Sequence, residues 1–146
     1  MSTATNTANK PLVYFVDDDE EDRRTFELAL SLSMPDCQVE TFSNGASFMQ
    51  AAQTAPQKPT LIFLDAHMPL IDGFSVLASL KTQEFWASVP VIMLSVSANP
   101  EDVQLSYRLG AQSWLTKPDS LSSLASMMDV VRQYWFGIVN RNPNVN

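Results

Sequence analysis

Short apolar runs alternate along the chain with amphipathic segments of about ten residues. Several of these runs are apolar almost throughout, which is typical of strands buried on both faces of a parallel sheet. The segments predicted as strands are 12–16, 38–42, 60–64, 89–94 and 113–116.

Polar residues and glycine mark the helices expected between these strands. Acidic residues open a segment in which Phe26, Ala29 and Leu30 recur at helical spacing, and Asn44 is a typical N-cap residue. The later helices are predicted from Asn44 to about residue 54, over 73–82, over 100–109 and from Ser120 onward. Strands that alternate with helices indicate an α/β fold, a five-stranded parallel sheet with helices on both faces.

The length of 146 residues suits one domain. We expect a disordered leader over 1–10, the domain with an extended last helix over 11–139, and a tail over 140–146. The polar N-terminus lacks the apolar stretch of a signal peptide, and no apolar run approaches the roughly 20 residues that span a bilayer. Cys37 is the only cysteine, so no internal disulfide can form. These features predict a cytoplasmic protein that does not insert into a membrane.

The net charge of −7 argues against a nucleic-acid partner, because 9 basic residues face 16 acidic ones. Non-specific binding to nucleic acid needs Lys and Arg to displace counterions from phosphates. The same balance gives no support to binding at an anionic membrane surface.

Chemically active side chains fall at the ends of the predicted strands. Asp17 and Asp18 follow the first strand, Asp65 the third, Ser95 the fourth and Lys117 the fifth. Ligands of an open parallel sheet bind beyond the carboxyl ends of its strands. We therefore expect three carboxylates, one hydroxyl and one ammonium group at a single edge.

Three crowded carboxylates repel one another, so either some are protonated or a divalent cation binds among them. Mg²⁺ suits such a site, because it accepts a few carboxylates and keeps waters that a phosphate oxygen can replace. One carboxylate can then attack phosphorus while Lys117 and Ser95 contact the phosphoryl oxygens. The residue types alone indicate phosphoryl transfer.

Four segments resemble the signatures of the receiver domains of two-component response regulators. They are Phe-Val-Asp-Asp-Asp at 15–19, Leu-Asp-Ala-His-Met-Pro-Leu-Ile-Asp-Gly at 64–73, Met-Leu-Ser at 93–95 and Thr-Lys-Pro at 116–118. The resemblance implies a strand order of 2-1-3-4-5, which places the first and third strands side by side. It also implies a stand-alone, chemotaxis-regulator-like signalling protein that catalyses only its own phosphorylation and dephosphorylation.

The resemblance assigns roles residue by residue. Asp65 becomes the phosphoacceptor, and Asp17 and Asp18 hold Mg²⁺ together with Asp65 and the backbone carbonyl of His67. Ser95 and Lys117 become the groups that sense the phosphoryl oxygens. A cis peptide bond is implied between Lys117 and Pro118.

Other residues near the site are expected to tune the switch. Trp114 takes the place of an aromatic side chain that moves with phosphorylation, although a packing role is an equal alternative. Val96 is larger than the residue that the family usually carries there and would narrow access to Asp65. His67 and Ser97 are expected to tune how easily water reaches the phosphoryl group. Phosphorylation would change the face made by the fourth helix, the fifth strand and the fifth helix.

The last helix carries two apolar stripes. Leu121, Leu124, Met128, Val131, Trp135 and Ile138 form one, and Met127, Val130 and Tyr134 form its neighbour. One stripe covers the sheet, and the second predicts a homodimer or a docked partner. The Tyr-Trp-Phe segment at 134–136 resembles regulators that partner phytochrome histidine kinases. The expected donor is a sensor histidine kinase, of the phytochrome type or another, or a phosphotransfer protein.

Three alternatives remain open at this point. A haloacid-dehalogenase-type phosphatase would carry an Asp where this chain has His67. A flavodoxin-like cofactor binder would need a phosphate-cradling loop, whereas the first loop here is acidic. A degenerate receiver that acts only as a docking module is the alternative closest to the main prediction.

Overall fold

Five parallel strands form one sheet in the order β2-β1-β3-β4-β5. The computed structural model describes residues 10–138. The strands are β1 (Leu12–Val16), β2 (Gln38–Phe42), β3 (Leu61–Asp65), β4 (Val91–Ser95) and β5 (Ser113–Thr116). The predicted fold class and strand order are therefore confirmed.

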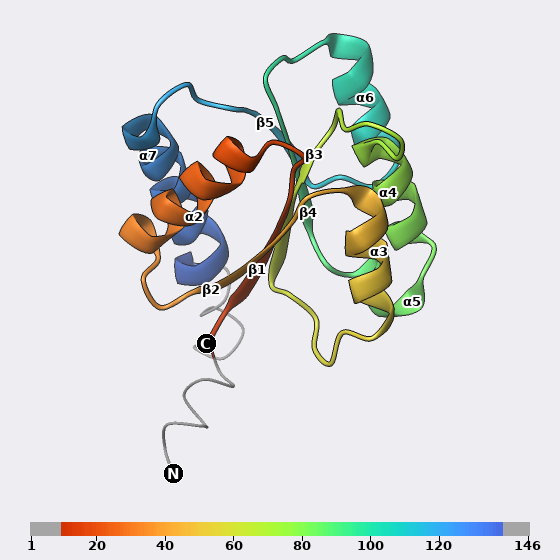
Figure 1. The fold of residues 1–146 in the computed structure, drawn as a ribbon, viewed down its shortest axis with the longest axis horizontal. Helices are drawn as coiled ribbons and strands as arrows, with labels where there is room; N and C mark the ends of the chain where they lie inside the picture. The colour runs from red at the N-terminus through yellow and green to blue at the C-terminus, as the bar shows by residue number, and fades with distance from the viewer. Residues whose placement is uncertain (1–9, 139–146) are drawn as a thin grey trace.

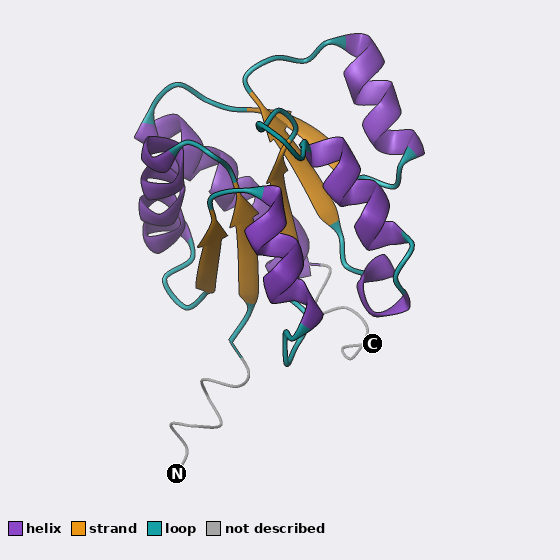
Figure 2. Cartoon of the chain, turned by 45° about the vertical axis from the view of Figure 1, so that its right-hand side comes forward, coloured by secondary structure: helices purple, strands orange, loops and turns teal. Residues whose placement is uncertain are grey.

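Helices cover both faces of this sheet. They are α2 (Glu20–Ser33), α3 (Gly45–Gln53), α4 (Gly73–Lys81), α5 (Glu84–Ala87), α6 (Pro100–Arg108) and α7 (Leu121–Val131), and α7 continues as the π-helix η1 (Arg132–Ile138). Figure 1 shows α2 and α7 together on one face and α3, α4, α5 and α6 on the other. All the strands point the same way, so their carboxyl ends lie at one edge (Figure 2).

Local capping explains where the helices near that edge begin. Asp19 caps α2 by accepting hydrogen bonds from the backbone N–H groups of Glu21 and Asp22, at 2.8 and 3.2 Å. Asp72 caps α4 through a 2.9 Å bond from the Ser75 N–H. Such side chains satisfy N–H groups that have no partner within the helix. The predicted N-cap role of Asn44 is confirmed in the same way.

Alternate residues of the central strands enter two separate cores. Phe15 of β1 faces α2, where its ring stacks on Phe26 at a centroid distance of 4.0 Å. Tyr14 faces the opposite layer and meets the ring of Phe48 edge-on at 5.9 Å. Burial on both faces explains the continuous apolar runs and fixes the strands that carry the polar edge.

The short helix α5 was not predicted. Its four residues are too few to show a helical period, and its inward residue, Trp86, is only 2% exposed. Trp86 packs in the core layer that also contains Tyr14 and Phe48. Tertiary packing thus decides a helix that the local pattern does not reveal.

The expected cis bond at Lys117–Pro118 is wrong, because every peptide bond between residues 10 and 138 is trans. The trans form of an X–Pro bond is favoured by about 0.5–1 kcal/mol. In this trans conformation, the backbone N–H of Lys117 donates a 2.7 Å hydrogen bond to the Ser95 carbonyl.

The last helix shows both predicted stripes in its described part. Leu124, Met128 and Val131 are buried against the sheet, whereas Val130 and Tyr134 are 66% and 56% exposed. Met127 is half-buried, and the side chains of Phe136 and Ile138 lie outside the described residues. Among the helices of residues 10–138, none combines the length and apolar character that crossing a membrane requires.

Candidate functional site

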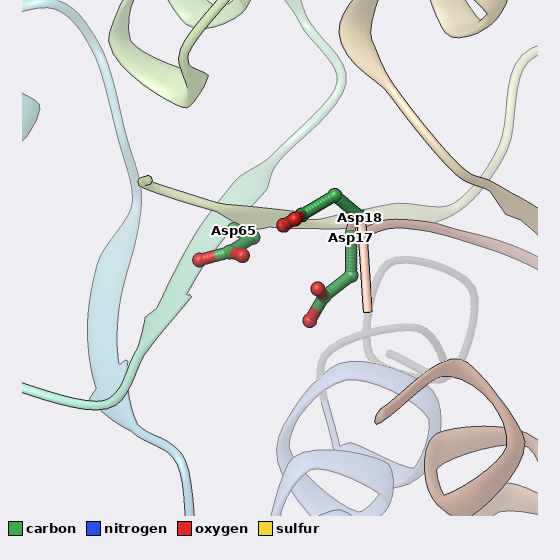
Figure 3. A group of neighbouring side chains, drawn as sticks. All are labelled: Asp17, Asp18 and Asp65. Atoms are coloured by element: carbon green, nitrogen blue, oxygen red, sulfur yellow. The ribbon is translucent and has the colours of Figure 1, made fainter. Parts of the chain in front are cut away.

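The register of the two central strands brings three carboxylates together. Val16 of β1 pairs with Leu64 of β3, so the residues that follow them, Asp17 and Asp65, emerge at the same level of the edge. One oxygen from each of Asp17, Asp18 and Asp65 lies within 4.8 Å of the others (Figure 3). Asp17 and Asp65 are buried, while Asp18 is exposed.

Backbone groups fix the orientation of the two buried carboxylates. Asp17 Oδ1 accepts a 3.0 Å hydrogen bond from the Asp19 N–H, and Asp65 Oδ1 accepts a 3.3 Å bond from the His67 N–H. A Cβ at Gly73 would come within 2.2 Å of the Asp65 carbonyl oxygen, so only glycine allows the α4 helix to start this close to the site.

Lys117 supplies the positive charge at the centre of the site. Its Nζ lies 2.7 Å from Asp17 Oδ2 and 3.6 Å from Asp65 Oδ2. The predicted convergence of Lys117 on the carboxylates is confirmed. A second contact was not predicted: Nζ donates a 2.8 Å hydrogen bond to Asp22 Oδ2.

Asp22 is one of the acidic residues that open the first helix, and no role at the site was predicted for it. A signal for its role was present, because Asp22 precedes the buried Phe26 by four residues and so shares the inward face of α2. That spacing places the carboxylate beside the sheet edge, where Lys117 emerges from β5.

Burial and mutual repulsion disfavour ionisation of the buried acids. Burial, followed by the charge of Asp17, raises the pKa of Asp65 from 3.8 to about 7, although Lys117 opposes the shift. Burial also raises the pKa of Asp17. Burial alone would lower the pKa of Lys117, but its close contacts with the carboxylates of Asp17 and Asp22 outweigh this effect and raise it. The site is thus short of positive charge.

A divalent cation fits the residues present. Three carboxylate oxygens converge, and oxygen ligands are those that hard cations prefer. The buried oxygen Oδ2 of Asp17 faces Lys117 but has no well-directed hydrogen bond among residues 10–138. An acidic metal-binding pocket is therefore present. The share of the His67 carbonyl in metal binding stays a prediction.

The remaining predicted residues surround the carboxylates. Ser95 ends β4 and is only 1% exposed. An open depression at this edge is lined by Asp17, Asp18, Asp19, Asp22, Asp65, His67, Ser95, Val96 and Lys117. Val96 is 75% exposed and forms part of the rim, so its effect on access stays a prediction. Ser97 and Trp114 lie outside the lining.

Aromatic and polar contacts connect the loops around the depression. The Trp114 indole N–H donates a 3.1 Å hydrogen bond to the Ser97 carbonyl, and its ring stacks on Phe74 at 6.2 Å. His67 Nε2 lies 3.4 Å from Oδ2 of Asp102, which belongs to the first turn of α6. The role of His67 and Ser97 in tuning water access stays a prediction.

Comparison with known proteins agrees with this geometry. Residues 13–129 match the family model of the response regulator receiver domain. The chain is 30% identical over 138 residues to the response regulator Rcp1 of Synechocystis sp., covering 90% of this chain and 94% of that protein. It spans about half the length of some other curated relatives, 54% of one and 46% of another.

Solved structures of similar proteins share the fold. One is a phosphorylated cyanobacterial phytochrome response regulator, RcpA, with a TM-score of 0.80 and 30% identity over 86% of this chain and 94% of that one. Another is the Mn²⁺-bound form of Rcp1, with a TM-score of 0.78 and 30% identity over 88% and 96% of the two chains.

The raised pKa of Asp65 predicts how stability depends on pH without metal. A carboxyl group whose pKa is raised by folding favours the folded state fully below its unfolded value, 3.8, and loses that contribution as pH rises through about 7. Asp65→Asn removes the loss, so the variant should be more stable than wild type by about 2 kcal/mol or more at pH 8. At pH 4 the difference should be small.

Urea unfolding in EDTA at pH 4, 6 and 8 measures this difference. Glu84→Gln, which removes an exposed carboxylate on α5, is the control and should show no comparable trend. A constant difference between wild type and Asp65→Asn across the pH range would contradict the prediction.

Proposed function

The chain belongs to the response regulator receiver family, and from this premise we propose that it accepts a phosphoryl group on Asp65 with Mg²⁺ bound. Asp17, Asp18, Asp65 and the His67 carbonyl would hold the ion. The observation that carries the proposal is the convergence of three carboxylates with Lys117 at one edge of the sheet.

The chain's own residues provide most of the chemistry. An oxygen of Asp65 attacks the phosphorus of a phosphohistidine while the phosphorus–nitrogen bond breaks and its electron pair stays on the donor imidazole. Lys117 pairs with a phosphoryl oxygen, and the Ser95 hydroxyl donates to another. A bound Mg²⁺ supplies the charge that offsets the crowded oxygens. Positive charge near Asp65 also favours its ionised, nucleophilic form.

The donor that we propose is a sensor histidine kinase of the phytochrome type or a phosphotransfer protein. The support is the similarity to Rcp1 and to RcpA, the latter described as a phytochrome response regulator. The rival function is that of a degenerate receiver that serves only as a docking module. The presence of Asp17, Asp18, Asp65, Ser95 and Lys117 around one depression favours phosphorylation.

Phosphorylation would act on the face formed by α6, β5 and α7. Ser95 lies two residues before Ser97, whose carbonyl accepts the Trp114 indole hydrogen bond. If Ser95 moves toward a phosphoryl oxygen, the loop after β4 moves with it and Trp114 loses or changes its partner. This contact supports the proposed switch, in which a local charge change alters a surface for partners.

A direct assay tests the proposed phosphorylation. Wild type incubated with acetyl phosphate and Mg²⁺ should gain one phosphoryl group by intact mass, because Asp65 is placed as the nucleophile. Asp65→Asn should gain none. EDTA should suppress the reaction of wild type. An unmodified wild type would favour the docking-module alternative.

Amide NMR tests the switch. Addition of beryllium fluoride and Mg²⁺, a phosphoryl mimic, should shift the Trp114 indole signal and the backbone signals of α6 and β5. The signals of α3, which lies away from this face, serve as the internal reference. Shifts confined to the loops that carry the carboxylates would contradict the prediction.

We also propose that the exposed stripe of the last helix forms a homodimer. Val130 and Tyr134 expose apolar surface on one side of α7 and η1, and aromatic residues often dominate binding energy at interfaces. Partner binding at the same face is the other use that this stripe would support.

Light scattering across a concentration series tests the dimer. Tyr134→Ala should raise the dimer dissociation constant by about tenfold or more, as for a central interface aromatic. Phe85→Ala is a matched control, because Phe85 is 43% exposed on α5, on the other side of the sheet. Monomers of wild type at all concentrations would refute the dimer.

A further inference from the structure

We infer that Asp22 is a positioning residue that restrains Lys117 in the unphosphorylated chain and so opposes the phosphorylated state. This inference rests on the proposed function of Asp65. It assigns a task to a fourth carboxylate, one that is not among the three convergent oxygens of the metal-binding pocket.

The distances show where the ammonium group is held. Lys117 Nζ is within hydrogen-bond distance of Asp22 Oδ2, at 2.8 Å, and of Asp17 Oδ2, at 2.7 Å. It is 3.6 Å from Asp65 Oδ2, which is an ion-pair contact but is too long for a hydrogen bond. Lys117 is therefore drawn to the α2 side of the depression and away from the phosphoacceptor.

The ion pair between Lys117 and Asp22 is partly shielded from solvent. The Lys117 side chain is only 13% exposed and that of Asp22 is 39% exposed. A hydrogen bond between two charged groups is stronger than one between neutral groups, and partial burial reduces its screening by salt. The same two residues also line a small cavity between α2 and α7, next to Phe26 and Leu124.

Asp22 cannot easily follow Lys117 toward a phosphoryl group. It lies in the first turn of α2, one turn before Phe26, whose fully buried ring stacks on Phe15 of the sheet. Packing of α2 on the sheet and on α7 fixes the helix axis, so only the short Asp22 side chain can move. When Lys117 turns to an oxygen on Asp65, its contact with Asp22 weakens.

The charge of Asp22 opposes phosphorylation in two ways. The ion pair stabilises the unphosphorylated state, and the charge of Asp22 also repels the added phosphoryl charge. Both effects act against phosphorylation. Removal of the charge should therefore strengthen binding of a phosphoryl mimic and lengthen the life of the phosphorylated state.

Asp22→Asn and Glu21→Gln form a matched pair of variants. Both remove one negative charge from the first turn of α2, but the Glu21 side chain is exposed and does not line the depression. At saturating Mg²⁺, Asp22→Asn should lower the half-saturating concentration of beryllium fluoride by about three- to tenfold. Glu21→Gln should change it by less than about twofold. The phosphoryl half-life should lengthen only in Asp22→Asn.

A second measurement separates positioning from a general effect on the helix. Asp22→Asn should lower the urea midpoint when Lys117 is present and leave it nearly unchanged in a Lys117→Met background. Equal effects of the two α2 variants on beryllium fluoride binding, or equal midpoint shifts in both backgrounds, would overturn the inference. If acetyl phosphate does not modify wild type, the proposed function fails as well. If acetyl phosphate does modify wild type, only the inference about Asp22 fails.

Discussion

The close approach of Asp17, Asp18 and Asp65 is the constraint on which the rest of the site depends. Oxygens within 4.8 Å of one another in a partly buried pocket repel strongly, and burial removes the water that would screen them. Lys117 offsets part of this repulsion, yet the pKa of Asp65 still rises to about 7. The arrangement is therefore suited to bind first a cation and then a phosphoryl group.

The sheet makes this crowding possible. Its two central strands, β1 and β3, are buried on both faces, for example by Phe15 in one core and Leu64 in the other, so their register cannot shift without moving apolar side chains out of both cores. Gly73 lets α4 start against the Asp65 backbone. The free energy that holds the carboxylates together therefore comes mainly from apolar packing in the two cores.

Lys117 links the site to two different elements. Through Asp22 it contacts α2, and through its backbone N–H it bonds the carbonyl of Ser95 on β4. The loop that follows Ser95 is in turn bonded to Trp114 through Ser97. A charge added at Asp65 would disturb both connections, which is the physical basis of the proposed restraint on one side and of the proposed signal to α6, β5 and α7 on the other.

The sequence by itself determined the strands, their capped helices and the five polar residues at the strand ends, because continuous apolar runs and N-cap residues are local features. Its four signature segments also indicated the strand order, through their resemblance to a known family. Only the tertiary structure decided the short helix around Trp86, the pairing of His67 with Asp102, and the contact of Asp22 with Lys117. Each of these depends on packing or on partners distant in the chain, 95 residues apart for Asp22 and Lys117, and no local pattern encodes such a distance.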